Sequence, residues 1–456
     1  MPNNIDLSDY YYNYEVLAKQ VLKIYFSQKI PSYPIDPFDI LSYFGVVYQF
    51  RNFKDLEGIY ILPETEDDIP IVGINNNRPI TRQGFTAAHE LCHHLKDRNS
   101  DFFCPIDGRN KSYIEKYADK FASALLLPKK ELEVQVKKLE KNNYIDFINI
   151  LYITDYFGVS FESCVFNIAY SLGKIEGTID PKEIKKRVRK FKPDKKRIEL
   201  GIKKYDLVLL KNIINSYEYF FESESKAVWY NFKSDFIYNE NKLEGINIEQ
   251  DSVSEILTDL RIYKQDSKYC KSQYKDIIEV VGHASMYDYI MATKDNLTIF
   301  KTLDLNAMLF QYAPYPEGAG KIRNSNNIVT QAQFETCDFC NISNELLKLN
   351  KDIEELLIKK DTISISQYVD EVVKIHHKIT VIHPFSDGNG RISRLMLNWF
   401  FKLNGLPLVY LKYKDKDKYY HALNKADSNG DYSYLSEVFY KEIIVSIIQL
   451  NTKFKL

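Results

Sequence analysis

The segment His383–Arg394, HPFSDGNGRISR, restricts the local fold more than any other part of the 456-residue chain. A helical pattern ends at His383, a loop with two glycines follows, and a second amphipathic pattern begins at Asn389. Glycines let backbone N–H groups come close to an anion, and the dipole of the following helix favours phosphate. The segment therefore predicts a helix–loop–helix unit that binds phosphate at its loop.

The charged side chains of this segment suit a nucleotide with a magnesium ion. Arg391 and Arg394 are three residues apart on the predicted helix, so both can face the same phosphates. Asp387 is placed to hold Mg²⁺ through one carboxylate. His383 is then the candidate general base.

A second chemical pattern lies in FTAAHELCHHLKD, on a helix predicted over Arg82–Lys96. His89 and His93 are four residues apart, which places two imidazoles on one helix face in a way that suits tetrahedral zinc. Glu90 lies beside them and could take a proton from a zinc-bound water. The alternative is a purely structural role, in which the two histidines of the helix pack in a core without a metal.

A catalytic zinc needs a third protein ligand and an open fourth position. Glu115, on a helix predicted over Ile114–Leu127, is spaced for that role. Asp119, one turn later, could orient a ligand by a hydrogen bond. His94 is expected to point away from the zinc face.

A basic segment divides the chain. Lys182–Arg197 carries ten basic residues in sixteen positions, although the whole chain is balanced at Lys+Arg 61 against Asp+Glu 62. We interpret it as an exposed linker or helix, with a nucleic-acid contact as the alternative. The expected organisation is a first domain at 1–180, a basic linker at 181–204 and a second domain at 205–456.

The overall composition is that of a globular protein, with 45% hydrophobic and 27% charged residues. No apolar run reaches the roughly 18 residues of a membrane span, and the N-terminus lacks a signal-peptide pattern. Six cysteines are too few for a disulfide framework in a chain of this length. We expect a cytoplasmic protein with reduced thiols and no membrane partner; its oligomeric state stays open.

The first domain is predicted to be α+β. An opening helix over Tyr10–Ser27 precedes Phe44–Phe50 and two runs, GIYILP and IPIVGIN, that read as an antiparallel pair. The second domain is predicted to be mainly helical. Its clearest helices are Tyr368–Ile382 and Asn389–Leu403.

The amino-terminal motifs resemble those of the ImmA/IrrE metallopeptidase family. The resemblance rests on FTAAHELCHH, EKYADKFASALLLP and Gly158-Val-Ser160, and it covers roughly the first 170 residues. It implies a zincin-like endopeptidase of the kind that cleaves transcriptional repressors. Cys92 stands where the family often has glycine.

The segment at 383–394 is similar to the signature of the Fic family, and it matches at every fixed position. The resemblance implies transfer of AMP from ATP to a Ser, Thr or Tyr hydroxyl of a target protein. His383 would deprotonate that hydroxyl, and Asn389 would position the α-phosphate. Gly388 and Gly390, on either side of Asn389 in the sequence, would also bind phosphate. Gly320–Ile328 resembles the β-hairpin flap of the family, which aligns the target by strand addition.

Two further segments carry weaker resemblance to this family. Tyr419 lies in a segment similar to the one lining the adenine side, and simple core packing is the alternative interpretation. Glu244 lies in YNENKLEG, which resembles the inhibitory motif whose glutamate pairs with the second arginine, here Arg394. The sequence departs from that motif because Glu240 replaces the usual hydroxyl residue.

Together these features predict a bifunctional regulatory enzyme: a zinc endopeptidase followed by an autoinhibited protein adenylyltransferase that uses ATP with Mg²⁺. Its expected partners are a protein target of adenylylation and a protein substrate of the peptidase, such as a repressor. Nucleic acid would bind only through the basic linker. The alternative hypothesis makes the first domain a non-cleaving module that recruits or senses a partner for the second.

Overall fold

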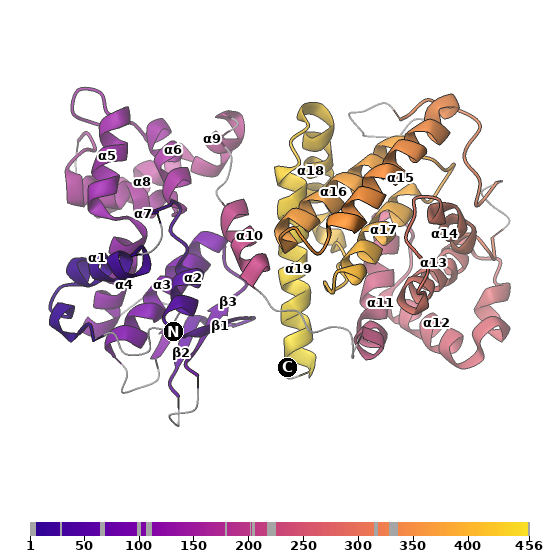
Figure 1. The fold of residues 1–456 in the computed structure, drawn as a ribbon, viewed down its shortest axis with the longest axis horizontal. Coiled ribbons are helices and arrows are strands. Elements are labelled where there is room, and N and C mark those ends of the chain that lie inside the picture. The colour runs from indigo at the N-terminus through magenta and orange to yellow at the C-terminus, as the bar shows by residue number, and fades with distance from the viewer. Residues whose placement is uncertain are drawn as a thin grey trace. The chain divides into compact units, whose positions relative to one another are not determined.

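The structure is a computed structural model that describes residues 6–27, 30–63, 69–97, 102–105, 112–177, 180–200, 202, 206–216, 225–313, 318–327 and 336–454. The chain divides into two compact units, Met1–Ser216 and Tyr217–Leu456 (Figure 1). Within the residues just given, no helix is long and apolar enough to cross a membrane. The mixed fold class is confirmed: the first unit is α+β and the second is helical.

A four-stranded sheet forms one layer of the first unit. Its order is β1-β3-β2-β4, with the strands at Val47–Arg51, Ile71–Asn75, Leu56–Ile61 and Phe102–Pro105. β2 pairs with β3 in antiparallel register, which confirms the predicted pair, whereas β1 runs parallel to β3. Val72, Ile74 and Tyr60 are buried under the helices that cover the sheet.

Helix α3, Ile80–Lys96, packs on β2 and β3 and also against α4, Tyr113–Leu126. Both helices agree with the sequence prediction to within two residues. Leu91 and Phe121 are fully buried between these layers. The other helices here are α1 (Tyr14–Tyr25), α2 (Pro37–Tyr43), α5 (Lys129–Leu139), α6 (Phe147–Phe157) and α7 (Phe161–Asn167).

The basic segment is folded onto the first unit. It forms α8, Pro181–Phe191, and α9, Pro193–Leu200. Ile184 and Val188 are buried on α8, and the buried Arg197 donates from Nη1 to Asp155 at 3.2 Å. The compact units therefore divide after α10, Asp206–Ser216, and not within 181–204 where we placed the linker.

The second unit is a helical body around α16, Ile365–Ile382, and α17, Asn389–Leu403. The predicted end of α16 and both predicted ends of α17 coincide with the observed ones. Tyr368 donates its hydroxyl to the carbonyl of Phe400 at 2.8 Å, which joins the two helices inside the core. The remaining helices are α11 (Ser225–Leu243), α12 (Gln250–Tyr263), α13 (Lys275–Ala292), α14 (Lys301–Leu309), α15 (Ile342–Lys359), α18 (Lys416–Asn429) and α19 (Ser433–Phe454).

The predicted hairpin flap is only partly described. Residues 318–327 form turns and contain no strand, and Ile328 lies outside the described residues. Arg323 fixes the described part, because its Nε donates to the carbonyl of His383 at 2.8 Å and its backbone N–H to that of Pro384 at 2.9 Å. The hairpin itself stays a prediction.

Candidate functional site

Three predicted zinc ligands converge in the first unit. The Nε2 atoms of His89 and His93, on α3, lie 3.2 Å apart, and the carboxylate of Glu115, on α4, lies 3.2 Å and 3.4 Å from them. Both imidazoles are fully buried, while Glu115 is 14% exposed. Among the described residues, this is the one group of three His, Cys, Asp or Glu side chains with the spacing of a metal site.

Carboxylates orient both imidazoles from the other side. The Nδ1–H of His89 donates to Asp119 at 3.0 Å, and that of His93 donates to Asp97 at 3.1 Å. With Nδ1 protonated, each Nε2 lone pair points into the cluster, as in most metal-binding histidines. Asp119 had been predicted for this role. Asp97 was not predicted to orient His93, although a position four residues later on a helix indicates such a contact.

The charges around the imidazoles favour a cation. Burial by itself would lower the pKa of His89, but hydrogen bonds with Asp119 and Glu115 raise it to about 9. The same kinds of contact, with Asp97 and Glu115, raise the pKa of His93. Two nitrogens and one carboxylate that converge in a negatively charged surrounding fit Zn²⁺ with an open position.

Glu90 is fully buried on α3 beside the cluster. A Cβ added at Gly58, on β2, would lie 2.8 Å from its Oε1, so only glycine lets the sheet approach this carboxylate so closely. His94 points elsewhere, since its Nδ1 lies 3.0 Å from the hydroxyl of Tyr60. Cys92 is buried outside the cluster, and burial raises its pKa well above the usual value.

In the second unit, the loop before α17 presents the amino end of a helix. Gly388 precedes the helix at φ +83°, a conformation that glycine adopts without strain. The side chain of Asn389 accepts from the N–H of Phe385 at 2.9 Å and donates to its carbonyl at 2.8 Å. Asn389 therefore stiffens the loop with its side chain, and the first-turn N–H groups of 389–391 remain the donors for a phosphate.

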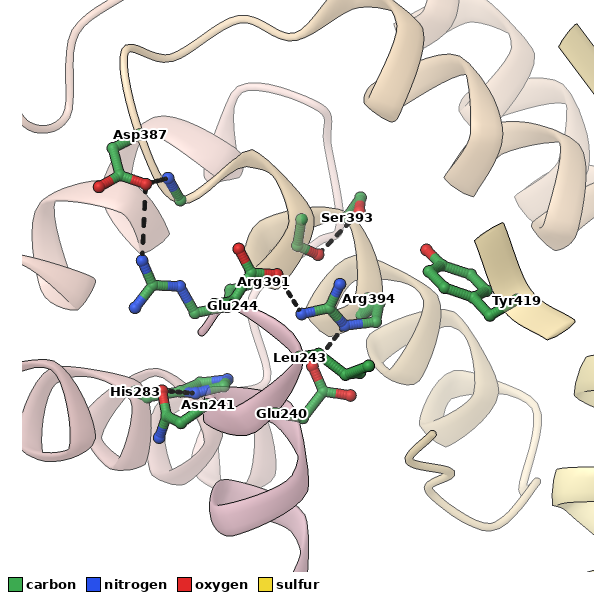
Figure 2. A network of polar contacts seen from close by, with 12 residues as sticks. Glu240, Asn241, Leu243, Glu244, His283, Asp387, Arg391, Ser393, Arg394 and Tyr419 are labelled. Atoms are coloured by element: carbon green, nitrogen blue, oxygen red, sulfur yellow. Dashed lines mark hydrogen bonds and ion pairs between the residues drawn. The ribbon is translucent and has the colours of Figure 1, made fainter. Parts of the chain in front are cut away.

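Arg391 and Asp387 lie at the same end of α17. Arg391 is buried and donates from Nη1 to Glu279, on α13, at 2.5 Å. Its Nη2 lies 3.7 Å from Asp387, whose side chain is 43% exposed (Figure 2). The carboxylate of Asp387 is thus accessible to a cation, and Glu279 is a counter-ion that sequence reasoning missed.

His383 has the hydrogen bond expected of a base. It caps α16 at φ +50°, and its Nδ1–H donates to the carbonyl of Thr380 at 3.3 Å. The proton on Nδ1 leaves Nε2 as the acceptor. Burial, helped by Arg323, lowers the pKa of His383 below its usual 6.5, so the imidazole is neutral at pH 7.

Arg394 forms ion pairs with two carboxylates, one on α11 and one in the turn that follows this helix (Figure 2). Its Nη2 donates to Glu244 at 2.7 Å, and its Nε donates to Glu240. Burial would raise the pKa of Glu244, but Arg394 and Arg391 hold it below its usual value. For Glu240 burial prevails, and its pKa is raised. The sequence did not predict the contact between Glu240 and Arg394, although Glu240 stands where the resembled motif usually has a hydroxyl residue.

Tyr419 lies on the other side of Arg394 (Figure 2). It is 2% exposed, and its hydroxyl lies 2.9 Å from Nε2 of the buried His376. This placement agrees with the packing interpretation. The neighbouring Tyr420 is 41% exposed and is the tyrosine of this segment that a ligand could reach.

Two family models match the chain. Residues 42–168 match the Peptidase_M78 family, described as an IrrE N-terminal-like domain, and residues 296–401 match the Fic/DOC family. The chain contains both domains. The converging His89, His93 and Glu115 lie in the first match, and the loop from His383 to Arg394 lies in the second.

Curated relatives named as protein adenylyltransferases match about a third of the chain. Protein adenylyltransferase Fic of Nematostella vectensis is 28% identical over 157 residues, which is 34% of this chain and 35% of the relative. Protein adenylyltransferase fic-1 of Caenorhabditis elegans is 31% identical over 134 residues, or 29% and 25% of the two chains. The chain thus spans about a third of the length of the first relative and about a quarter of the length of the second. A solved structure of Fic-1 from C. elegans is 19% identical with a TM-score of 0.44, covering 82% of this chain and 99% of that one.

Proposed function

We propose that the second unit is a protein adenylyltransferase held inactive by Glu244. The observation that carries the proposal is the ion pair between Glu244 and Arg394 at the amino end of α17. A Cβ added at Gly390 would lie 2.6 Å from the Glu244 carboxylate, so this carboxylate lies against the loop where phosphate would approach. The curated adenylyltransferase relatives support the reaction class.

Different residues of this loop and helix would carry out the separate parts of the adenylyl transfer. Nε2 of His383 would take the proton of a target hydroxyl as that oxygen attacks the α-phosphorus of ATP, and pyrophosphate would leave. The N–H groups of Gly390 and Arg391 would bind the phosphates at the helix end. Asp387 would hold Mg²⁺, which supplies charge neutralisation to the phosphates when bound.

Labelling with ATP that is radioactive at the α-phosphate tests this reaction. We expect label to appear in protein when the full chain carries Glu244→Gly, and to disappear when ATP labelled at the γ-phosphate replaces it. Transfer of the γ-label instead would show a kinase reaction and contradict the proposal.

The pH profile of the transfer is a further prediction. His383 acts as a base only when unprotonated, and its pKa lies below 6.5. In the Glu244→Gly background the rate should therefore change little between about pH 8 and about pH 7 and fall as the solution is acidified further. The initial rate of labelling measured across this range checks it. A fall that begins above pH 7 would contradict the neutral imidazole.

We further propose that the first unit is a zinc endopeptidase acting on a regulatory protein. His89, His93 and Glu115 would hold Zn²⁺, which supplies Lewis acidity and a more acidic bound water when present. Glu90 would accept the proton of the attacking water at its carboxylate. The proposal is supported by the family match and by the two aspartates that fix the imidazoles.

Metal analysis of the full chain checks the ligands. We expect a single zinc ion per chain in the wild type and none in Glu115→Ala, because two imidazoles alone do not complete the site. Asp119→Asn should keep zinc with an affinity lowered on the order of 10- to 100-fold. His94→Gln is the matched control and should bind as the wild type does. Zinc retained by Glu115→Ala would assign the third ligand elsewhere.

A further inference from the structure

Two carboxylates bind one guanidinium in the second unit, and they differ in exposure. Glu240 is 1% exposed and accepts from Nε of Arg394, whereas the side chain of Glu244 is 22% exposed and accepts from Nη2. Glu240 therefore holds the stem end of the guanidinium inside the protein. Glu244 holds its outer end, where solvent or a ligand can reach it.

The two carboxylates also differ in how firmly the backbone holds them. Glu240 lies within α11, and its neighbour Asn241 is buried with Oδ1 3.2 Å from Nδ1 of His283 (Figure 2). Lys233, on the same helix, donates to Asp288 at 2.6 Å, and both contacts tie α11 to α13. Glu244 follows the last helical residue, beside Gly245 at φ +80°, where the chain has left the helix.

A nucleotide entering at α17 would meet Glu244 first. The Glu244 carboxylate lies against Gly390, at the helix end that would bind phosphate, while Glu240 lies behind the guanidinium. Displacing Glu244 would free Nη2 and leave the bond from Nε in place. A guanidinium held at Nε presents its two outer nitrogens to a phosphate in a fixed orientation.

Resting on the proposed adenylyl transfer, we infer that Glu240 is a positioning residue, which keeps Arg394 aimed at the terminal phosphate of ATP after Glu244 has been displaced. Two glutamates four residues apart thus have opposite effects on the same arginine. Removing Glu244 aids ATP binding. Shortening Glu240 lets the guanidinium turn away and weakens binding of the terminal phosphate.

The test measures how well the full chain discriminates a triphosphate from a diphosphate. The probes are α,β-methylene ATP and α,β-methylene ADP with Mg²⁺, which cannot be cleaved at the reacting bond. Dissociation constants are measured by calorimetry for Glu244→Gly alone and combined with Glu240→Gln or Glu240→Asp. Gln keeps the reach of an oxygen acceptor without the charge, and Asp keeps the charge without the reach.

We expect Glu244→Gly to prefer the triphosphate on the order of tenfold, the effect of one charge-assisted contact. Combined with Glu240→Gln this preference should persist, and with Glu240→Asp it should fall to about twofold or less. Both changes are conservative, and thermal unfolding establishes that each variant is folded. A tighter triphosphate complex in either combined variant would make Glu240 a second inhibitory carboxylate, and an unchanged preference in both would give it no role in binding.

The same samples separate this inference from the reaction on which it rests. If Glu244→Gly binds the triphosphate analogue but transfers no α-label from ATP to protein, the adenylyl transfer is wrong and the preference still decides the role of Glu240. If α-label is transferred and Glu240→Asp leaves the preference intact, only the positioning role is wrong.

Discussion

Glu244→Gly is expected to raise adenylylation by about tenfold or more, equivalent to about 1.4 kcal/mol of barrier. In the wild type the Glu244 carboxylate binds Nη2 of Arg394 and lies against Gly390, so ATP meets an occupied arginine. Without that carboxylate, Arg394 can bind the terminal phosphate and align the α-phosphate for attack. The measurement is the initial rate of α-label incorporation, including incorporation into the chain itself.

Two further variants make this prediction specific. Adding His383→Ala to Glu244→Gly should return labelling to background, because the general base is then missing. Glu249→Gly is the matched control: Glu249 is exposed at the amino end of α12, where its side chain caps no backbone group and glycine is tolerated. Equal labelling in the wild type and Glu244→Gly, both folded, would place control of this site elsewhere.

Glu90→Gln is expected to abolish peptide cleavage by the first unit while zinc remains bound. Glu90 lies beside the cluster and is outside the group of three ligands, so its loss removes a proton acceptor and no metal contact. General-base catalysis typically contributes about 10²- to 10⁴-fold, and the cleavage rate should fall by that order. Cleavage of a candidate regulatory protein and the zinc content are measured on the same preparation.

The outcome also separates a peptidase from a recognition module. Glu162→Gln, an exposed glutamate of α7, is the control and should leave both zinc and cleavage unchanged. If Glu90→Gln loses zinc together with cleavage, Glu90 belongs among the ligands. If the wild type cleaves nothing and Glu90→Gln still supports every effect of the first unit on the second, the unit is a module that recruits or senses a partner.

Local patterns predicted the elements that carry the chemistry. The i, i+4 spacing of His89 and His93 and the change of pattern at Gly388 depend on residues near one another in sequence, so helix geometry alone relates them. For the same reason α17 was predicted with its observed ends. The position of Glu115 near the two histidines was predictable because Glu115 lies on the next helix, α4, which packs directly on α3.

Contacts over long sequence separations could not be predicted in this way. Glu279 meets Arg391, and Glu240 meets Arg394, across more than a hundred residues, and only the packing of α11 and α13 on α17 brings them together. Tyr419 is buried by the packing of the helices, which agrees with the core-packing interpretation of its segment, and its contact with a nucleotide stays a prediction.

The basic segment has a consequence for how the first unit can be isolated. A fragment ending at residue 180 would strip α8 and α9 from the surface they cover and remove the guanidinium of Arg197 from Asp155. It would also lose α10, whose Asn212 donates to the buried Asp36 at 2.8 Å. A fragment ending at Ser216 retains these contacts, and its solubility should exceed that of the shorter one because the apolar surface under α8, α9 and α10 stays covered.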